Sequence, residues 1–155
     1  MFKKTISTDI SKTTIIIRLM VGAVFLSEGI QKFLFPAIRG AGRFEKMGFS
    51  NPDIWGNLVG VCEILCGLLL LFGFFTRVAA LGMLINMTVA IIITKIPIAF
   101  GESFGPFNLR ELSNYGVWNF AHEVRTDLAM WMGSLFLIIK GGGFWSIDKN
   151  MYKTK

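Results

Sequence analysis

Two carboxylic acid side chains, Glu28 and Glu63, stand inside long apolar stretches of the sequence. An unpaired charge inside a bilayer costs at least ~2.5–3.5 kcal/mol, so such a residue is expected to pair within a helix bundle or to line a polar cavity. A buried carboxyl group is also suited to exchanging protons with a bound ligand. We therefore expect Glu63 and Glu28 to be the catalytic residues of a site within the membrane.

Each of these carboxylates has a structural alternative. Glu28 and Lys32 are four residues apart, so on one helix they can simply neutralise each other. Glu63 has no basic partner on its own helix, and Arg18, Lys32 or Arg125 from a neighbouring helix would have to pair with it. If Glu63 pairs with a buried cation, its role is structural.

Further polar and aromatic residues fall on helix faces that are expected to point inward. Asn86 is a candidate ligand-binding residue or a hydrogen bonder between helices, and His122 is a candidate proton relay or a plain interfacial histidine. Arg18 and Asp148 are expected near the same membrane face, where they would form a structural ion pair. The predicted ligand-binding residues are Lys32, Asn86, His122, Arg125, Asp127 and Trp131.

Several kinds of chemistry do not fit the sequence. His122 is the single histidine, which excludes a bis-histidine haem or a three-histidine metal site held by this chain alone. Cys62 and Cys66 are one helical turn apart, which is neither a Cys-x-x-Cys pair nor a spacing that a regular helix holds in disulfide geometry. We interpret both cysteines as packing residues, and we expect no metal site.

These residues lie on four apolar segments, each close to the ~20 residues that a membrane-spanning helix needs. Pro36 is expected to end the first helix and Pro97 the third, and the short turn from Gly73 to Arg77 makes the second and third helices an antiparallel hairpin. The sequence predicts one all-α domain over residues 1–155, a polytopic four-helix bundle. Its predicted spans are residues 14–35, 55–75, 77–96 and 119–140.

Small residues indicate how the helices pack. Gly56, Gly60 and Gly67 share a helical face with Glu63, and this spacing lets transmembrane backbones approach closely. Glu63 is therefore expected to face the interior, in a cavity shared with the first and fourth helices. The connection over residues 98–118 is rich in glycine and aromatic residues, and it is either an interfacial segment that folds back over the mouth of the bundle or an ordinary surface loop.

The net charge of +6 is scattered through loops and tails, without a basic face interleaved with aromatic residues, so it does not indicate nucleic acid as a partner. Attraction to lipid headgroups explains the charge better. The terminal segments are purely basic apart from Asp9 and Asp148, which favours cytoplasmic termini. Their lysines are Lys3, Lys4, Lys12, Lys149, Lys153 and Lys155. We expect a multi-pass protein of the inner (plasma) membrane.

Four blocks of this sequence, in order, resemble DoxX-type membrane proteins. They are Arg18-Leu-x-x-Gly22-x-x-Phe25-x-x-x-Gly29-x-x-Lys32; Met47-Gly-Phe-Ser-Asn-Pro52; Glu63-x-x-x-Gly67-Leu-Leu-Leu-Leu-Phe-Gly73-Phe-Phe-Thr-Arg77 continued by Ala79-Ala80-Leu; and Gly141-x-Gly143-Phe-Trp-Ser146-Ile-Asp148. The resemblance implies a four-helix membrane protein linked to quinone or thiol redox systems. Some members are named as small subunits of thiosulfate:quinone oxidoreductases. The long aromatic third loop and the charges from His122 to Asp127 depart from the family pattern.

The leading hypothesis is a quinone-interacting subunit of a membrane redox system, with quinone as the cofactor and a soluble or membrane redox partner as the source of electrons. In it, Glu63 and Glu28 exchange protons with the quinone ring. A carrier or receptor for a small solute is one alternative, and a membrane anchor that recruits a soluble redox enzyme is another. The sequence leaves open whether the protein forms a homo-oligomer.

Overall fold

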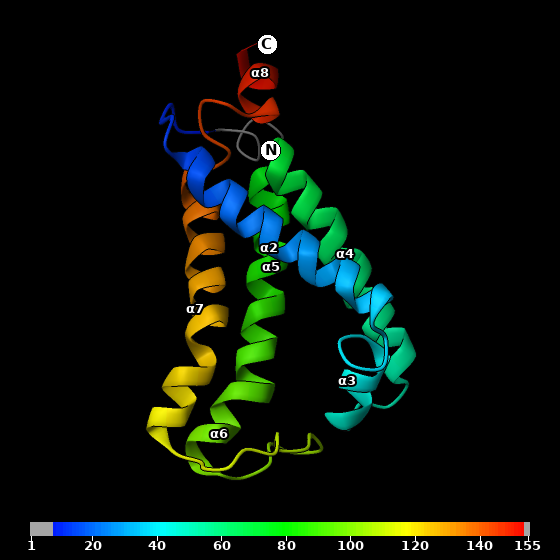
Figure 1. The fold of residues 1–155 in the computed structure, drawn as a ribbon. Coiled ribbons are helices and arrows are strands. Elements are labelled where there is room, and N and C mark those ends of the chain that lie inside the picture. The colour runs from blue at the N-terminus through cyan, green and yellow to red at the C-terminus, as the bar shows by residue number, and fades with distance from the viewer. Residues whose placement is uncertain (1–7, 154–155) are drawn as a thin grey trace.

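The computed structural model describes residues 8–153, and within that range the chain forms helices joined by loops, without a β-strand. The predicted all-α class is therefore confirmed. Three of the six lysines on which the predicted orientation rests, Lys3, Lys4 and Lys155, lie outside the described residues. The elements shown in Figure 1 are α2 (Thr14–Leu34), α3 (Ala41–Lys46), α4 (Pro52–Phe72), α5 (Thr76–Ala90), the π-helical turn η1 (Ile91–Lys95), α6 (Ile96–Phe100), α7 (Val117–Lys140) and α8 (Ile147–Lys153).

Three helical stretches are long and apolar enough to cross a membrane, namely α2, α4 and the continuous stretch Thr76–Phe100 formed by α5, η1 and α6. With its 24 residues, α7 is also long enough. Its first half carries Glu123, Arg125 and Asp127, however, and it does not reach the same apolar character. Length and composition thus support three of the four predicted spans.

The third stretch does not end at Pro97, and this prediction was wrong. After α5 the backbone widens into η1, where the N–H of Ile96 donates to the carbonyl of Ile91, five residues earlier. Pro97 then lies in the first turn of α6, where the N–H that proline lacks needs no helical partner. The helix continues to Phe100 and ends at Gly101, whose φ of 71° is left-handed.

The second span begins and ends three residues earlier than predicted. Pro52 starts α4 because its fixed φ is already helical, and it follows Asn51, whose φ of 60° sets the entry turn. At the other end Gly73 adopts a left-handed φ of 66°, and its N–H donates to the last carbonyls of α4. The chain enters α5 at Thr76, which confirms the predicted tight hairpin.

Two helix pairs make up the molecule, α2 with α4 and α5 with α7. Figure 1 shows that the pairs lie together at the end that carries the first and last described residues and diverge towards the other end. The contact between α2 and α4 depends on glycine. A Cβ atom added to Gly29 would lie 2.8 Å from the carbonyl oxygen of Gly60, and one added to Gly67 would lie 2.7 Å from the backbone nitrogen of Leu26.

We expect Gly29→Ala to destabilise the protein by ~1–3 kcal/mol, because the new methyl group would press on the backbone of α4, which cannot move as a side chain can. Thermal unfolding in detergent measures this loss. Gly82→Ala is the matched control, because its Cβ would meet just the Sγ atom of Cys66, at an ordinary 3.5 Å. Equal melting temperatures for the two variants would contradict the role assigned to Gly29.

At the end that carries the first and last described residues, Arg18 binds the segment after α7. The buried guanidinium donates hydrogen bonds to the carbonyl oxygens of Gly142, at 2.5 Å, and Trp145, at 2.6 Å. Gly141 ends α7, as predicted, and leaves these carbonyls outside any helix. Arg18 therefore satisfies backbone acceptors that would otherwise be buried without a donor.

Asp148 stabilises the other side of the same junction. Its carboxylate accepts hydrogen bonds from the backbone N–H groups of Phe75, at 2.8 Å, and Thr76, at 2.9 Å, which lie at the start of α5. Arg18 and Asp148 do not form the predicted direct ion pair, because each charged group is hydrogen-bonded to backbone groups instead. Both residues nevertheless tie α2 and the α4–α5 turn to the end of the chain.

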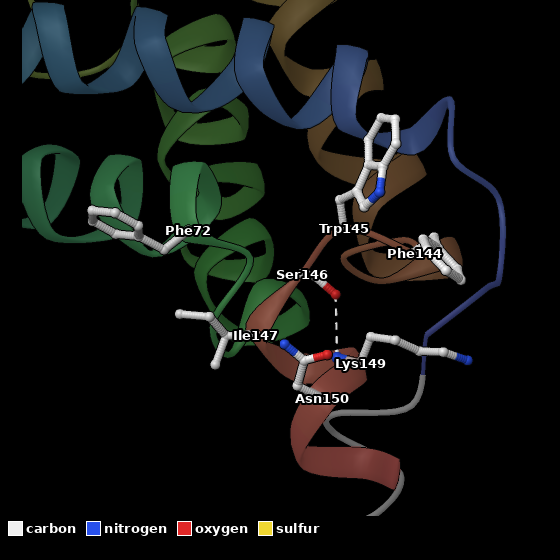
Figure 2. Close-up of a pocket in the computed structure, with 7 residues that line it drawn as sticks. All are labelled: Phe72, Phe144, Trp145, Ser146, Ile147, Lys149 and Asn150. Carbon is white, nitrogen blue, oxygen red and sulfur yellow. Dashed lines mark hydrogen bonds between the residues drawn. The ribbon is translucent and has the colours of Figure 1, made fainter.

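A shallow pocket of about 340 Å³ lies beside this junction. In Figure 2, Phe72 and Ile147 lie on one side of the pocket, and Trp145 and Lys149 lie on its other sides. The N–H of Lys149 donates to the Oγ atom of Ser146 at 3.2 Å. Trp145 is 56% exposed. Exposed aromatic and basic residues at the ends of spans are typical of the region where a membrane meets water.

At the opposite end the loop before α7 folds back onto α3 and the turn after it. The backbone N–H of Asn108 donates to the carbonyl of Met47 at 3.0 Å, and its side-chain amide donates to the carbonyl of Lys46 at 3.1 Å. The rings of Phe49 and Phe107 lie 4.8 Å apart. The segment before α7 therefore folds back onto α3 and the turn after it, as expected if it is not an ordinary surface loop.

Candidate functional site

A pocket of about 690 Å³ opens between the two helix pairs. Its volume lies within the range of small-molecule sites. We call it the charged pocket, because its apolar walls are interrupted by acidic and basic groups. The aromatic and methionine residues that line it are Phe25, Phe44, Phe49, Trp55, Met47, Met83, Met87 and Met130, and the charged ones are Glu28, Glu63, Glu123, Asp127, Lys32, Arg39, Arg43, Lys95, Arg110 and Arg125.

The deepest polar group in this pocket is the carboxylate of Glu63, which is 3% exposed. One carboxylate oxygen lies 2.5 Å from the Nζ atom of Lys32, and the other accepts a hydrogen bond of 3.1 Å from the side-chain amide of Asn86. We call these three residues the inner centre. It joins α2, α4 and α5, so both carboxylate oxygens are held by neighbouring helices.

The glycine face of α4 explains this placement. Because Gly60 and Gly67 admit the backbone of α2, Glu63 on the same face lies directly against that helix. Lys32 is therefore the basic partner of Glu63, rather than Arg18 or Arg125. The prediction that Glu63 faces the interior agrees with its burial and with its place in a pocket that α2 and α7 also line.

Glu28 does not pair with Lys32, although the two are four residues apart. Lys32 is turned towards α4, and the carboxylate of Glu28 instead lies 3.5 Å from the guanidinium of Arg39, beyond the end of α2. Both side chains of this pair are more than one-third exposed, at 37% and 44%. Glu28 thus belongs to the rim of the charged pocket and not to its buried centre.

A second group of charges, the outer centre, joins η1, α7 and the loop between α6 and α7. The Nζ atom of Lys95 lies 3.3 Å from the carboxylate of Asp127 and 3.7 Å from that of Glu123. Arg110 lies 2.6 Å from the same Glu123 oxygen. The side chain of Lys95 is 9% exposed, while Arg110 is largely exposed at 56%.

Comparison with known proteins places this sequence in a family. The DoxX family profile matches residues 13–96, which include all three residues of the inner centre. The chain belongs to the DoxX family. It is also 46% identical over 141 residues to the uncharacterized membrane protein Rv3486 of Mycobacterium tuberculosis, an alignment that covers 91% of this chain and 82% of that protein. No solved structure gives a significant match.

The DoxX profile ends just after Lys95, so the two carboxylates of the outer centre lie beyond the matched residues. Asp127 is a residue that the sequence singled out, whereas Lys95 and Arg110 were missed. In the sequence Lys95 is simply the end of an apolar segment, and Arg110 belongs to a loop. The one signal that could have found Lys95 is that it is a lysine at the end of a long apolar segment, where an acidic partner from another helix is expected.

Of the three remaining predicted ligand-binding residues of this DoxX protein, two line the charged pocket and one does not. His122 and Arg125 are exposed and line the outer part of the charged pocket, where the guanidinium of Arg125 donates to the carbonyl of His122 at 2.6 Å. Trp131 does not line the pocket: its indole N–H donates to the hydroxyl of Thr88 at 2.9 Å, and its ring packs against the core. Trp131 is therefore a packing residue between α5 and α7.

Cys62 and Cys66 are free thiols that line the charged pocket next to Glu63. Among the described residues, no three histidine, cysteine or acidic side chains are grouped as metal ligands. The pocket therefore offers a ligand a set of apolar walls, two groups of paired charges, and the ammonium and amide donors of Lys32 and Asn86.

Proposed function

We propose that this DoxX protein is a quinone-interacting subunit of a membrane redox system, with the quinone ring bound in the charged pocket. The observation that carries the proposal is the inner centre, a buried carboxylate and ammonium pair at the wall of an otherwise largely apolar pocket. Aromatic and methionine side chains suit a flat apolar ring, while Lys32 and Asn86 are donors for a ring oxygen.

The proposal includes α7 as a fourth membrane span, so that the four long helices form a bundle in the bilayer. The charges of α7 support this, since Glu123 and Asp127 are paired with Lys95 on the pocket side. Its exposed large residues are apolar along one stripe, as a lipid-facing surface requires: Leu128, Met132, Phe136 and Ile139. We place the protein in the inner membrane with both termini in the cytoplasm.

Reduction of a quinone to a hydroquinone takes up two electrons and two protons. In this proposal a dithiol or reduced flavin of a redox partner supplies the two electrons and is oxidised. Glu63 passes one proton to the ring oxygen that Lys32 contacts, and the other ring oxygen takes its proton from water at the open side of the pocket. The pair is suited to this because Lys32 stabilises the carboxylate after it has given up a proton, and Asn86 keeps the carboxylate in place. Glu28, at the exposed rim, exchanges protons between water and the pocket.

The second candidate function is a carrier or receptor for a small anionic solute. The basic side chains around the pocket favour it: Arg39, Arg43, Arg110 and Arg125 all line the outer part. In that case a polyanionic metabolite, and not a quinone, raises the melting temperature of the purified protein.

The test is direct binding. We expect protein reconstituted in lipid nanodiscs to bind dimethyl-para-naphthoquinone, whose blocked ring positions cannot react with Cys62 or Cys66, and to quench the fluorescence of Trp55. The double variant Lys32→Met/Glu63→Leu, which removes the charged hydrogen-bond donor without leaving a buried carboxylate unpaired, should weaken binding ~10-fold. Empty nanodiscs and Lys149→Met, outside the pocket, are the controls. Quenching equal to that of empty nanodiscs would refute the proposal.

A further inference from the structure

The outer centre has donor capacity that its own ion pairs do not use. Lys95 carries three N–H groups, and its contacts of 3.3 Å and 3.7 Å to Asp127 and Glu123 are longer than a good charged hydrogen bond. Glu123, in contrast, has a close partner in Arg110 at 2.6 Å. The ammonium of Lys95 is buried, lines the charged pocket, and can turn towards a ligand while Glu123 keeps Arg110 as its partner.

The position of Lys95 relative to the inner centre is fixed by one helix. Asn86, which holds Glu63, and Lys95 are nine residues apart on the continuous stretch of α5 and η1. At the α-helical rise this is an offset of roughly 13 Å along the axis. The same pocket therefore presents two separate donor groups, one deep and one near the mouth, with apolar walls between them.

We infer that the outer centre is the second recognition site of the pocket, and that its ligand is an elongated flat ring with a hydrogen-bond acceptor at each end. A ligand with one acceptor would engage just one of the two groups, and Lys95 would be left with its long contacts of 3.3 Å to Asp127 and 3.7 Å to Glu123. A para-quinone has its two oxygens at opposite ends of the ring, and one hydrogen bond of ~2.8 Å at each end extends the distance between donors to about 11 Å. This inference rests on the proposed function, and it assigns the second ring oxygen to Lys95.

The test compares dimethyl-para-naphthoquinone with the corresponding tetralone, which lacks the second carbonyl and is saturated at the other positions of the ring that bears the first. Because the two rings also differ in saturation, the decisive comparison is how each ligand's binding changes in the Lys95 variants. Binding to protein in lipid nanodiscs is measured by titration, with empty nanodiscs as the blank. We expect wild type to bind the quinone ~10-fold more tightly than the tetralone. Lys95→Met should remove this preference, while tetralone binding changes little.

Lys95→Met leaves Asp127 without its cation, so the double variant Lys95→Met/Asp127→Asn serves as a second, charge-balanced test. Lys140→Met, whose ammonium lies outside the pocket, should keep the full preference. Equal binding of both ligands to wild type, or a preference that persists in both Lys95 variants, would overturn the inference and leave the proposed function standing. If wild type binds neither ligand, the proposed function fails and the inference fails with it.

Discussion

Replacing Glu63 by glutamine is expected to lower quinone-dependent turnover by ~10²–10⁴-fold, the range typical of losing general acid–base help. Glutamine has nearly the shape of glutamate, and its carbonyl can still accept a hydrogen bond from Lys32 or Asn86. It cannot release and take up a proton. Turnover is measured in membranes reconstituted with the redox partner at saturating quinone, together with quinone binding, which should change little.

Glu28→Gln is the matched control, since it removes a carboxylate at the exposed rim of the same pocket. We expect a smaller loss of turnover for Glu28→Gln than for Glu63→Gln, because water can replace a proton donor at an exposed position. Wild-type turnover for Glu63→Gln would refute proton transfer by this residue. A Glu63→Gln protein that inserts poorly would instead assign Glu63 a structural role as the partner of Lys32.

The second large effect concerns stability. Lys32→Met should destabilise the protein by ~3–5 kcal/mol, because it leaves the buried Glu63 carboxylate without its cation. Lys32→Met combined with Glu63→Leu should recover most of this loss, since no isolated charge then remains in the apolar interior. Unfolding in detergent gives the free energies of the single and double variants.

Arg39→Gln with Glu28→Gln is the comparison pair for that experiment. The ion pair that these two residues form is exposed, with 3.5 Å between its charged atoms. Each single variant and the double variant should therefore change the free energy of unfolding by ~0–1 kcal/mol. If the effects of Lys32→Met and Glu63→Leu simply add, the two residues are not energetically coupled and the ion pair is not what stabilises the inner centre.

Features that depend on periodic spacing were predicted best from the sequence. The inward direction of Glu63 rests on residues that repeat at helical intervals, and the glycine face of α4 reflects how closely two backbones pack. The bounds of α2 followed from the length of an apolar segment and from Pro36. Spacing on one helix cannot, however, choose between partners. The pairing of Lys32 with Glu63 instead of Glu28 depends on how near α4 lies, which is a tertiary contact.

The errors have two physical origins. Arg18 was expected to bond a carboxylate, but the glycine-rich segment after α7 turns its carbonyls towards the guanidinium, and no pattern of side chains predicts that. Lys95 was missed because a regular helix was assumed up to Pro97. A π-helical turn is invisible to a 3.6-residue period, and it changes the direction of every later residue in the helix.

The turn η1 has the effect of one residue inserted into an otherwise regular helix. Each residue of an α-helix advances by about 100° around the axis, so the extra one shifts the register of all that comes after it. A DoxX chain with one residue fewer between Ala90 and Pro97 would keep the inner centre unchanged. Its lysine would no longer face Asp127, and Pro97 would interrupt a regular α-helix. The outer centre of this protein therefore depends on the number of residues in this short stretch, whereas the inner centre does not.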